Sequence, residues 1–320
     1  MSAQILFIAS GPIGDAVLCT GALEYALEQH PGARAFIACG PVAAPLFRAT
    51  PNLAKLHIIR RQPWSAHWFA LWRDMRGQHF DLAVDMRGTA TTLALSAKRR
   101  IIFRKTPLIR HKVEEFAALM GADRPLAPRI RLDEAAREAA RAALQGASPL
   151  LAMAPGGDYA GKLWPAQRFT ELAARLTAPN APLAGATVVL RCGPADAHIA
   201  ADIAASLGRI GVRALDLTEK MDLLAFAAVL AEATLFVGND SGPMHMAAAL
   251  GAPTLGLFGP TDDRLYAPWG PRARALRAKS YEDLMARAQA HGRMSALMDD
   301  ISVDAAEEAA QALLLAGGLA

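Results

Sequence analysis

The densest cluster of residues suited to chemistry follows an apolar run in the second half of the chain, and reads Asn239-Asp240-Ser241-Gly242-Pro243-Met244-His245. The run Thr234–Gly238 predicts a strand. Ser241 is a good N-cap for the helix that follows, and Pro243 lies in the first turn, where its missing N–H costs nothing. Such a turn directs free backbone N–H groups and the positive helix end beyond the carboxyl edge of a sheet, where a phosphate can bind.

Two further residues of this turn favour a diphosphate ligand. Gly242 has no side chain to hinder its close approach, and His245 lies one helical turn after Ser241 on the same face. The alternative is an ordinary capped helix with a hydrogen-bonded histidine. The residues predicted to contact the phosphates are Asp240, Ser241, Gly242, Pro243, Met244 and His245.

A second polar loop carries one lysine just before a predicted helix, and reads Pro155-Gly156-Gly157-Asp158-Tyr159-Ala160-Gly161-Lys162-Leu163-Trp164. Lys162 can act as a point charge on a diphosphate. The loop is not a Walker A motif, because its spacing differs and no Ser or Thr follows the lysine. The alternative is a surface lysine beside a packed Trp164.

Two aspartates complete the set of candidate site residues. Gly11-Pro12-Ile13-Gly14-Asp15 follows the first apolar run, so Asp15 is predicted at a helix start, where the dipole favours its ionised form. It can accept a proton from a substrate hydroxyl or cap the helix. Asp216 follows another predicted strand and can bind ribose hydroxyls or cap the helix predicted over Asp222–Ala231.

A basic run in the first half indicates an anionic acceptor, such as a phosphorylated glycolipid core, although basic runs are more often solvated surface. Gly14 and these side chains are the predicted acceptor contacts: Arg99, Arg100, Arg104, Lys105, Arg110 and Lys112.

Composition limits the class of protein. The 320 residues are 53% hydrophobic, with a formal net charge of +4 and a pI of about 9.1. This suits anionic small substrates and does not require nucleic acid. The three cysteines lack metal-ligand spacing, and there is no Asp-x-Asp pair, so we expect no metal, no cofactor and a reducing compartment. No signal peptide or membrane span is evident, which predicts a cytoplasmic protein.

Strand-like runs alternate with helical patterns in both halves, which predicts an α/β protein with two Rossmann-like domains, 1–148 and 149–320. The strands expected in the first domain are Ile5–Ala9, Arg34–Cys39, Leu56–Ile59, Leu82–Asp85 and Ile101–Phe103. The helices expected there include Asp15–Gln29, Trp64–Met75, Thr89–Ala97 and Val113–Met120, and Asp123–Arg131 is expected to be a linker. The second domain is expected to begin with strand Leu150–Ala154.

These motifs resemble glycosyltransferase family 9, the ADP-heptose:lipopolysaccharide heptosyltransferases. The resemblance covers nearly the whole chain: Ile13-Gly14-Asp15, Lys162-x-Trp164-Pro165, Asn239 to His245, Leu257-Phe258-Gly259-Pro260-Thr261-Asp262 and Met298-x-x-Ile301-Ser302-Val303. It implies a GT-B fold with the two sheets facing a central cleft. The first domain would bind the acceptor and the second the donor, and a last helix at about 303–316 would return to the first domain.

The resemblance also implies an inverting, metal-independent transfer of a sugar, by default heptose from ADP-heptose, to a lipopolysaccharide-core or related glycan. Asp15 would be the base, Lys162 and the turn from Asp240 to His245 would hold the donor, and Asp216 would contact the nucleoside. ADP would be the product, and the enzyme would touch the inner membrane only peripherally. The alternatives are another GT-B enzyme, such as a sugar-nucleotide epimerase, or a non-catalytic nucleotide-sugar binding protein.

Overall fold

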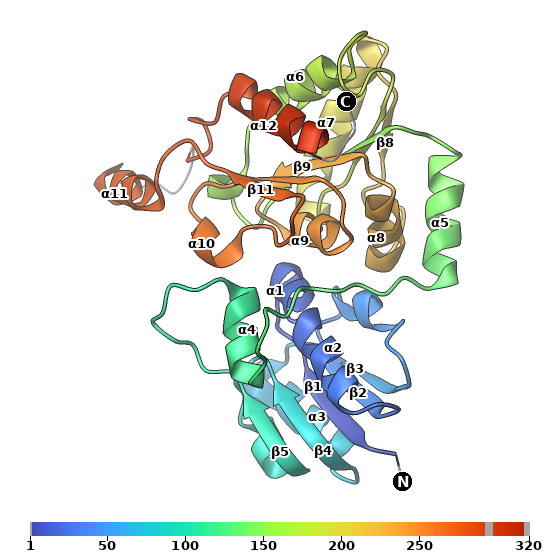
Figure 1. Ribbon diagram of the computed structural model, residues 1–320, viewed down its shortest axis with the longest axis vertical. Coiled ribbons are helices and arrows are strands. Elements are labelled where there is room, and N and C mark those ends of the chain that lie inside the picture. Colours follow the sequence, from blue (N-terminus) through green and yellow to red (C-terminus); the bar gives the residue numbers. More distant parts are fainter. Residues whose placement is uncertain (1, 292–296, 317–320) are drawn as a thin grey trace. The chain divides into compact units, whose positions relative to one another are not determined.

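The computed structural model describes residues 2–291 and 297–316, and divides into two compact units, Met1–Asp133 and Glu134–Ala320 (Figure 1). Each unit is an α/β structure with a parallel sheet. The boundary lies between residues 133 and 134 and not at the predicted 148/149. The reason is helix α5 (Glu134–Leu144), which packs on α8 (Leu223–Ala231) of the second unit.

The sheet of the first unit has the order β3-β2-β1-β4-β5, with every neighbouring pair parallel. The central strands are almost fully buried, which matches the apolar runs from which they were predicted. The strands are β1 (Gln4–Ile8), β2 (Arg34–Cys39), β3 (Leu53–Ile58), β4 (His79–Asp85) and β5 (Ser96–Ile102).

The helices of this unit confirm some predictions and correct others. The helix predicted over Asp15–Gln29 is two helices, α1 (Ile13–Leu18) and α2 (Thr20–Gln29), which meet at Cys19. Helix α3 (Ala66–Met75) packs Leu71 and Met75 against one face of the sheet. Helix α4 (Lys112–Met120) packs against α2 and ends at Gly121, whose φ of 73° suits glycine.

The helix predicted over Thr89–Ala97 is wrong. The segment contains one 3-10 turn, Thr91–Ala94, and then enters β5 at Ser96. Pairing with β4 along its whole length supplies the backbone hydrogen bonds of β5, and this tertiary pairing outweighs the helical preference of the alanines and leucines.

The segment predicted as a linker, Asp123–Arg131, is an ordered strap across α2. Arg131 forms a bidentate ion pair with Glu24, at 2.9 and 2.6 Å, and the backbone N–H of Arg129 donates to the Thr20 hydroxyl at 2.9 Å. The strap lies so close to α2 that a Cβ on Gly21 would stand 2.1 Å from the Leu126 carbonyl oxygen. Glycine is therefore required where the strap crosses the helix.

The second unit has a six-stranded parallel sheet in the order β11-β10-β9-β6-β7-β8. Its strands are β6 (Leu150–Ala154), β7 (Thr187–Leu190), β8 (Ala214–Asp216), β9 (Leu235–Asn239), β10 (Thr254–Leu257) and β11 (Ala273–Leu276). Helices α6 (Ala166–Thr177), α7 (Ala197–Arg209) and α12 (Val303–Ala316) contribute to one large apolar core with the sheet. The remaining helices are α9 (Gly242–Ala249), α10 (Asp263–Tyr266) and α11 (Tyr281–His291).

Helix α12 belongs to the second unit. Its buried residues Ala306, Ala310 and Leu314 share a core with α6 and with the strands of this sheet. That the last helix also packs on the first unit stays a prediction. None of the helices within residues 2–291 and 297–316 is long and apolar enough to cross a membrane.

Candidate functional site

The strand order of the second sheet places β6 and β9 side by side at the point where the chain reverses its direction of winding. Ala154 lies opposite Gly238 in the register of these two strands. The loop after β6 and the turn after β9 therefore leave the same carboxyl edge next to each other. In open parallel sheets, this position is where ligands bind.

Asn239 ties these two connections together. The amide of this fully buried side chain donates to the Pro155 carbonyl at 2.7 Å, and its oxygen accepts from the Trp164 N–H at 3.2 Å. These bonds fix both ends of the loop that carries Lys162. Asn239 is thus a positioning residue, a role that the sequence pattern did not predict for it.

Lys162 and Asp240 form an ion pair at this edge. The distance from Lys162 Nζ to Asp240 Oδ2 is 2.7 Å, and the two side chains are only 15% and 6% exposed. The lysine also lies 5.8 Å from the centre of the Tyr159 ring. Burial raises the pKa of Tyr159, so the phenol is neutral beside the ammonium group. Lys162 is therefore held at the switch point and is not a solvated surface lysine.

The start of α9 differs from the prediction in one respect. Ser241 occupies the N-cap position, but its hydroxyl makes no capping hydrogen bond. Pro243, in the second helical position, removes one of the two N–H groups that an N-cap side chain can bond, and the other, on Met244, is not bonded by Ser241. Among the described residues, the buried Ser241 Oγ has no hydrogen-bond partner. Helix geometry leaves the Gly242 and Met244 amides without an intrahelical acceptor.

His245 lies close to the ion pair. Its ring is 4% exposed, and its Nε2 stands 4.0 Å from Asp240 Oδ1. The turn thus places a carboxylate, an ammonium group, a hydroxyl and an imidazole around the start of one helix. The structure brings together all the phosphate-contact residues predicted in this segment.

Asp216 ends β8, on the same edge of the same sheet. Its carboxylate accepts from the Thr218 N–H at 2.9 Å. The helix after it is capped by Asp222, which accepts from the Ala225 N–H at 2.8 Å. The alternative that Asp216 caps this helix is therefore wrong, whereas its predicted contact with a nucleoside stays a prediction.

In the first unit, β1 and β4 occupy the equivalent switch point. Asp15 is in the first turn of α1, directly after β1, and is half-buried. Pro12 holds the N-cap position, so Asp15 is inside the helix and is not its cap. Asp15 therefore lies at a helix start, as the sequence predicted, and its role as a base stays a prediction.

The structure separates the predicted basic cluster into two groups. Arg100 donates to the backbone carbonyls of Thr92, at 2.9 Å, and Ala97, at 3.0 Å, and Lys112 pairs with Glu115. These two cations hold the fold of the unit. Arg99 lies midway along β5, opposite Leu82.

Three other members of the cluster are exposed in the loop between β5 and α4: Arg104, Lys105 and Arg110. They are at the carboxyl end of β5, on the edge from which Asp15 also extends. These three therefore lie on the edge where an acceptor bound near Asp15 would be found.

Two residues of this edge were not singled out from the sequence. Asp85 ends β4, is fully buried, and accepts hydrogen bonds from the Arg87 and Thr89 N–H groups at 2.9 and 2.8 Å. Burial raises the pKa of Asp85, and these hydrogen bonds oppose that effect. The turn brings the half-buried Arg87 to the end of the sheet. The signal was Asp-Met-Arg-Gly at the end of a predicted strand.

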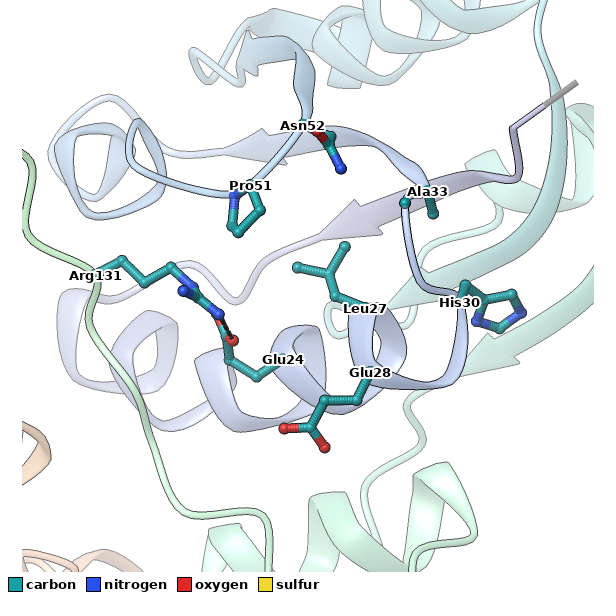
Figure 2. Close-up of a pocket in the computed structure, with 9 residues that line it drawn as sticks. Glu24, Leu27, Glu28, His30, Ala33, Pro51, Asn52 and Arg131 are labelled. Carbon is teal, nitrogen blue, oxygen red and sulfur yellow. Dashed lines mark hydrogen bonds and ion pairs between the residues drawn. The ribbon is translucent and has the colours of Figure 1, made fainter.

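A pocket of the first unit lies elsewhere (Figure 2). It is bordered by α2, by Arg131, and by residues Ala33 and Asn52, which precede β2 and β3. The pocket is therefore at the amino end of the sheet, opposite Asp15. Its charged lining includes Glu28 and the structural pair Glu24–Arg131, and nothing predicted from the sequence falls in it. No group of three or more potential metal ligands occurs within the described ranges.

Two parallel sheets with these strand orders define a protein of two Rossmann-like units. A family model described as glycosyltransferase family 9 (heptosyltransferase) matches residues 90–291, and the chain belongs to this family. The protein is therefore a glycosyltransferase, as the sequence predicted. The lipooligosaccharide heptosyltransferase 2 of Campylobacter jejuni subsp. jejuni serotype O:6 is 26% identical over 270 residues, or 80% of this chain and 82% of the relative.

Solved structures share the fold. The glycosyl transferase family 9 protein from Veillonella parvula matches with a TM-score of 0.82 and 21% identity, over 99% of this chain and 98% of the other. E. coli ADP-heptose lps heptosyltransferase II matches with a TM-score of 0.80 and 20% identity, over 98% and 99%. These matches confirm the predicted GT-B fold class. That the two sheets face a central cleft stays a prediction.

Proposed function

We propose that this glycosyltransferase transfers heptose from ADP-heptose to a lipopolysaccharide-core or related anionic glycan, with inversion at the anomeric carbon and without a metal ion. The support for the substrate class is membership of the heptosyltransferase family. The relatives are named for heptose transfer to lipooligosaccharide or lipopolysaccharide. The reaction would occur in the cytoplasm, where the enzyme would meet a lipid-linked acceptor peripherally at the inner-membrane surface.

The observation that carries the donor site is the buried Lys162–Asp240 pair at the switch point of the second sheet. A diphosphate bound here would meet the Lys162 ammonium group and the amides at the start of α9, two kinds of donor that favour phosphate oxygens. In this proposal these donors stabilise the diphosphate in place of a divalent cation, with Lys162 turning from Asp240 to the phosphate oxygens. Asp216, on the same edge, would bind the ribose hydroxyls of the nucleoside.

The proposed chemistry is one in-line displacement. Asp15 takes the proton of the acceptor hydroxyl while the hydroxyl oxygen forms a bond to the anomeric carbon. The bond from that carbon to the diphosphate oxygen breaks, and ADP leaves with the electron pair on its terminal phosphate. Lys162 and the α9 amides stabilise this developing charge. The mechanism requires the two units to bring Asp15 and the donor together during turnover.

The test is a transfer assay with radiolabelled ADP-heptose and lipopolysaccharide from a strain whose core lacks heptose. We expect labelled acceptor, release of ADP, an inverted anomeric configuration and full activity in EDTA. UDP-sugars and GDP-sugars should be poor donors. Loss of activity in EDTA with recovery on adding a metal would contradict the metal-independent site. Donor turnover without an acceptor would indicate an epimerase.

A further inference from the structure

Arg87 is a half-buried cation of the first unit that, unlike the others there, has no ion-pair partner within the described residues. Four Lys or Arg side chains are half-buried within residues 2–133. Three of them are ion-paired: Arg48 with Asp133, Lys112 with Glu115 and Arg131 with Glu24. Arg87 has no ion pair with any residue that the structure describes, although the Asp85 carboxylate acts electrostatically on it and partly opposes the effect of burial on its pKa. A partly desolvated charge without a directly paired counter-ion is unfavourable unless another group supplies one.

The guanidinium group is held in place by contacts that leave its outer nitrogens available. Its Nε donates to the Ala9 carbonyl at 2.9 Å, and its Cζ lies 5.7 Å from the centre of the Trp68 ring. The two terminal nitrogens, Nη1 and Nη2, make no hydrogen bond within the described part of the chain. Burial lowers the pKa of Arg87, but a guanidinium group stays charged at neutral pH.

The position of Arg87 connects it with the proposed acceptor site. A Cβ on Gly11 would stand 3.7 Å from Nη2, and a Cβ on Gly40 would stand 3.8 Å from it. Gly11 follows β1 and Gly40 follows β2, so the guanidinium group lies where the ends of β1, β2 and β4 meet. Gly11 also begins the short loop that leads to Asp15 in α1.

The turn that presents Arg87 is held by several hydrogen bonds. The buried Asp85 carboxylate accepts from the backbone N–H groups of Arg87 and Thr89 and from the Thr89 hydroxyl. Gly88 has a φ of 68°, and a Cβ there would stand 2.6 Å from the Phe103 carbonyl oxygen. The residues on both sides of Arg87 thus have defined positions, which is how a preorganised binding group is built.

We infer that Arg87 binds a carboxylate or phosphate group of the acceptor and so positions the accepting hydroxyl for Asp15. This inference rests on the proposed function, because it assigns the acceptor to the first unit. A guanidinium group binds either anion in a bidentate manner, through two parallel N–H donors. Arg87 is a substrate-binding residue in this account, and the exposed Arg104, Lys105 and Arg110 supply only a general positive potential.

The experiment measures acceptor and donor KM for Arg87→Ala, Arg87→Lys and a matched control. The control is Arg76→Ala, because the exposed Arg76 also lies 5.7 Å from a tryptophan ring, that of Trp72. We expect Arg87→Ala to raise the acceptor KM roughly 10- to 100-fold, as loss of a charged hydrogen bond does. The donor KM should not change, Arg87→Lys should be intermediate, and Arg76→Ala should match the wild type.

The same assay identifies the anion. The heptose-deficient lipopolysaccharide is used intact, after phosphatase treatment and after methyl esterification of its carboxylates. Removal of the group that Arg87 binds should raise the wild-type KM to that of Arg87→Ala, and should not raise the KM of the variant further. An unchanged acceptor KM in Arg87→Ala would overturn the inference. The inference would also be overturned if the acceptor KM of Arg87→Ala exceeded that of the wild type by the same factor on both modified acceptors. That result would indicate a structural role for Arg87.

The inference can fail separately from the proposed function. If the wild-type protein shows no transfer from ADP-heptose, calorimetric binding of the intact acceptor to the wild type and to Arg87→Ala still decides it. Weaker binding by the variant, with an unchanged melting temperature, would support the anion site, and equal binding would refute it.

Discussion

The two units place a cation at the same position of their sheets but differ in how that cation is paired. Both place their candidate residues at the switch point of a parallel sheet, between β1 and β4 in the first unit and between β6 and β9 in the second. In the second, the cation Lys162 is paired with Asp240 beside the start of α9. In the first, the Arg87 guanidinium group forms no ion pair with any described residue, although the Asp85 carboxylate acts on it electrostatically. A bound ligand can replace Asp240 as the partner of Lys162. The Arg87 guanidinium group, by contrast, needs a ligand to supply a directly paired counter-ion.

The largest effect expected from this comparison concerns Asp15. Asp15→Asn removes the proposed base but retains its shape, and we expect the transfer rate to fall by about 10²–10⁴. The matched control is Asp123→Asn, an exposed aspartate of the same unit. The measurement is single-turnover transfer of radiolabelled heptose. A folded Asp15→Asn protein with full activity would eliminate Asp15 as the base.

The second effect concerns the ion pair of the other unit. Lys162→Ala should lower kcat/KM for the donor by the equivalent of about 1.5–3 kcal/mol, because a charge-assisted contact to the diphosphate is lost. Lys279→Ala is the control, since Lys279 pairs with Asp300 at 3.1 Å but is 47% exposed. Steady-state kinetics with varied donor would measure both. Equal losses in the two variants would mean that the position of Lys162 has no special importance.

The third effect tests how the first unit is held together. Gly21→Ala should lower the free energy of unfolding by about 1–3 kcal/mol, because the new methyl group overlaps the Leu126 carbonyl and forces the strap away from α2. Gly77→Ala is the control, since a Cβ there would meet nothing within 4 Å. Urea denaturation gives both values. An unaffected Gly21→Ala protein would show that the strap does not need this close approach.

The smallest effect concerns the reactivity of the buried cysteines, which should be equally low in both units. Burial raises the pKa of Cys19, Cys39 and Cys192 to about 12 in each case. At pH 8, the thiolate fraction is then on the order of 10⁻⁴, and only thiolates alkylate readily. We expect no labelling of the native protein by iodoacetamide in mass spectrometry, and full labelling in urea. Rapid labelling of one native cysteine would show that its unit opens more easily than the other.

The contrast between the units also explains what the sequence could predict. Asp240 to His245 form one continuous segment after a strand, so their proximity follows from the chain itself. In the first unit, Arg87 comes close to Gly11, in the loop that leads to Asp15, only through the pairing of β1 with β4. Spacing along the chain does not reveal this contact, so Asp15 was singled out and Arg87 was missed.

The same reasoning applies to the elements of the fold. Strands such as β6 were predicted exactly, because a buried parallel strand is a short apolar run with clear breaks at both ends. The edge strand β5 was assigned in part to a helix, because its exposed lysine and arginines conceal the pattern. The domain boundary was misplaced because the attachment of α5 to α8 is a tertiary contact between distant segments.

The central claim is that the second unit binds the donor diphosphate while the first supplies the base. The most direct test is calorimetric binding of ADP to the wild type, Asp15→Asn and Lys162→Ala. The account predicts that Asp15→Asn binds ADP as the wild type does, although its transfer is impaired, and that Lys162→Ala binds ADP more weakly. Wild-type affinity in Lys162→Ala, or a loss of ADP affinity in Asp15→Asn as large as that in Lys162→Ala, would contradict it.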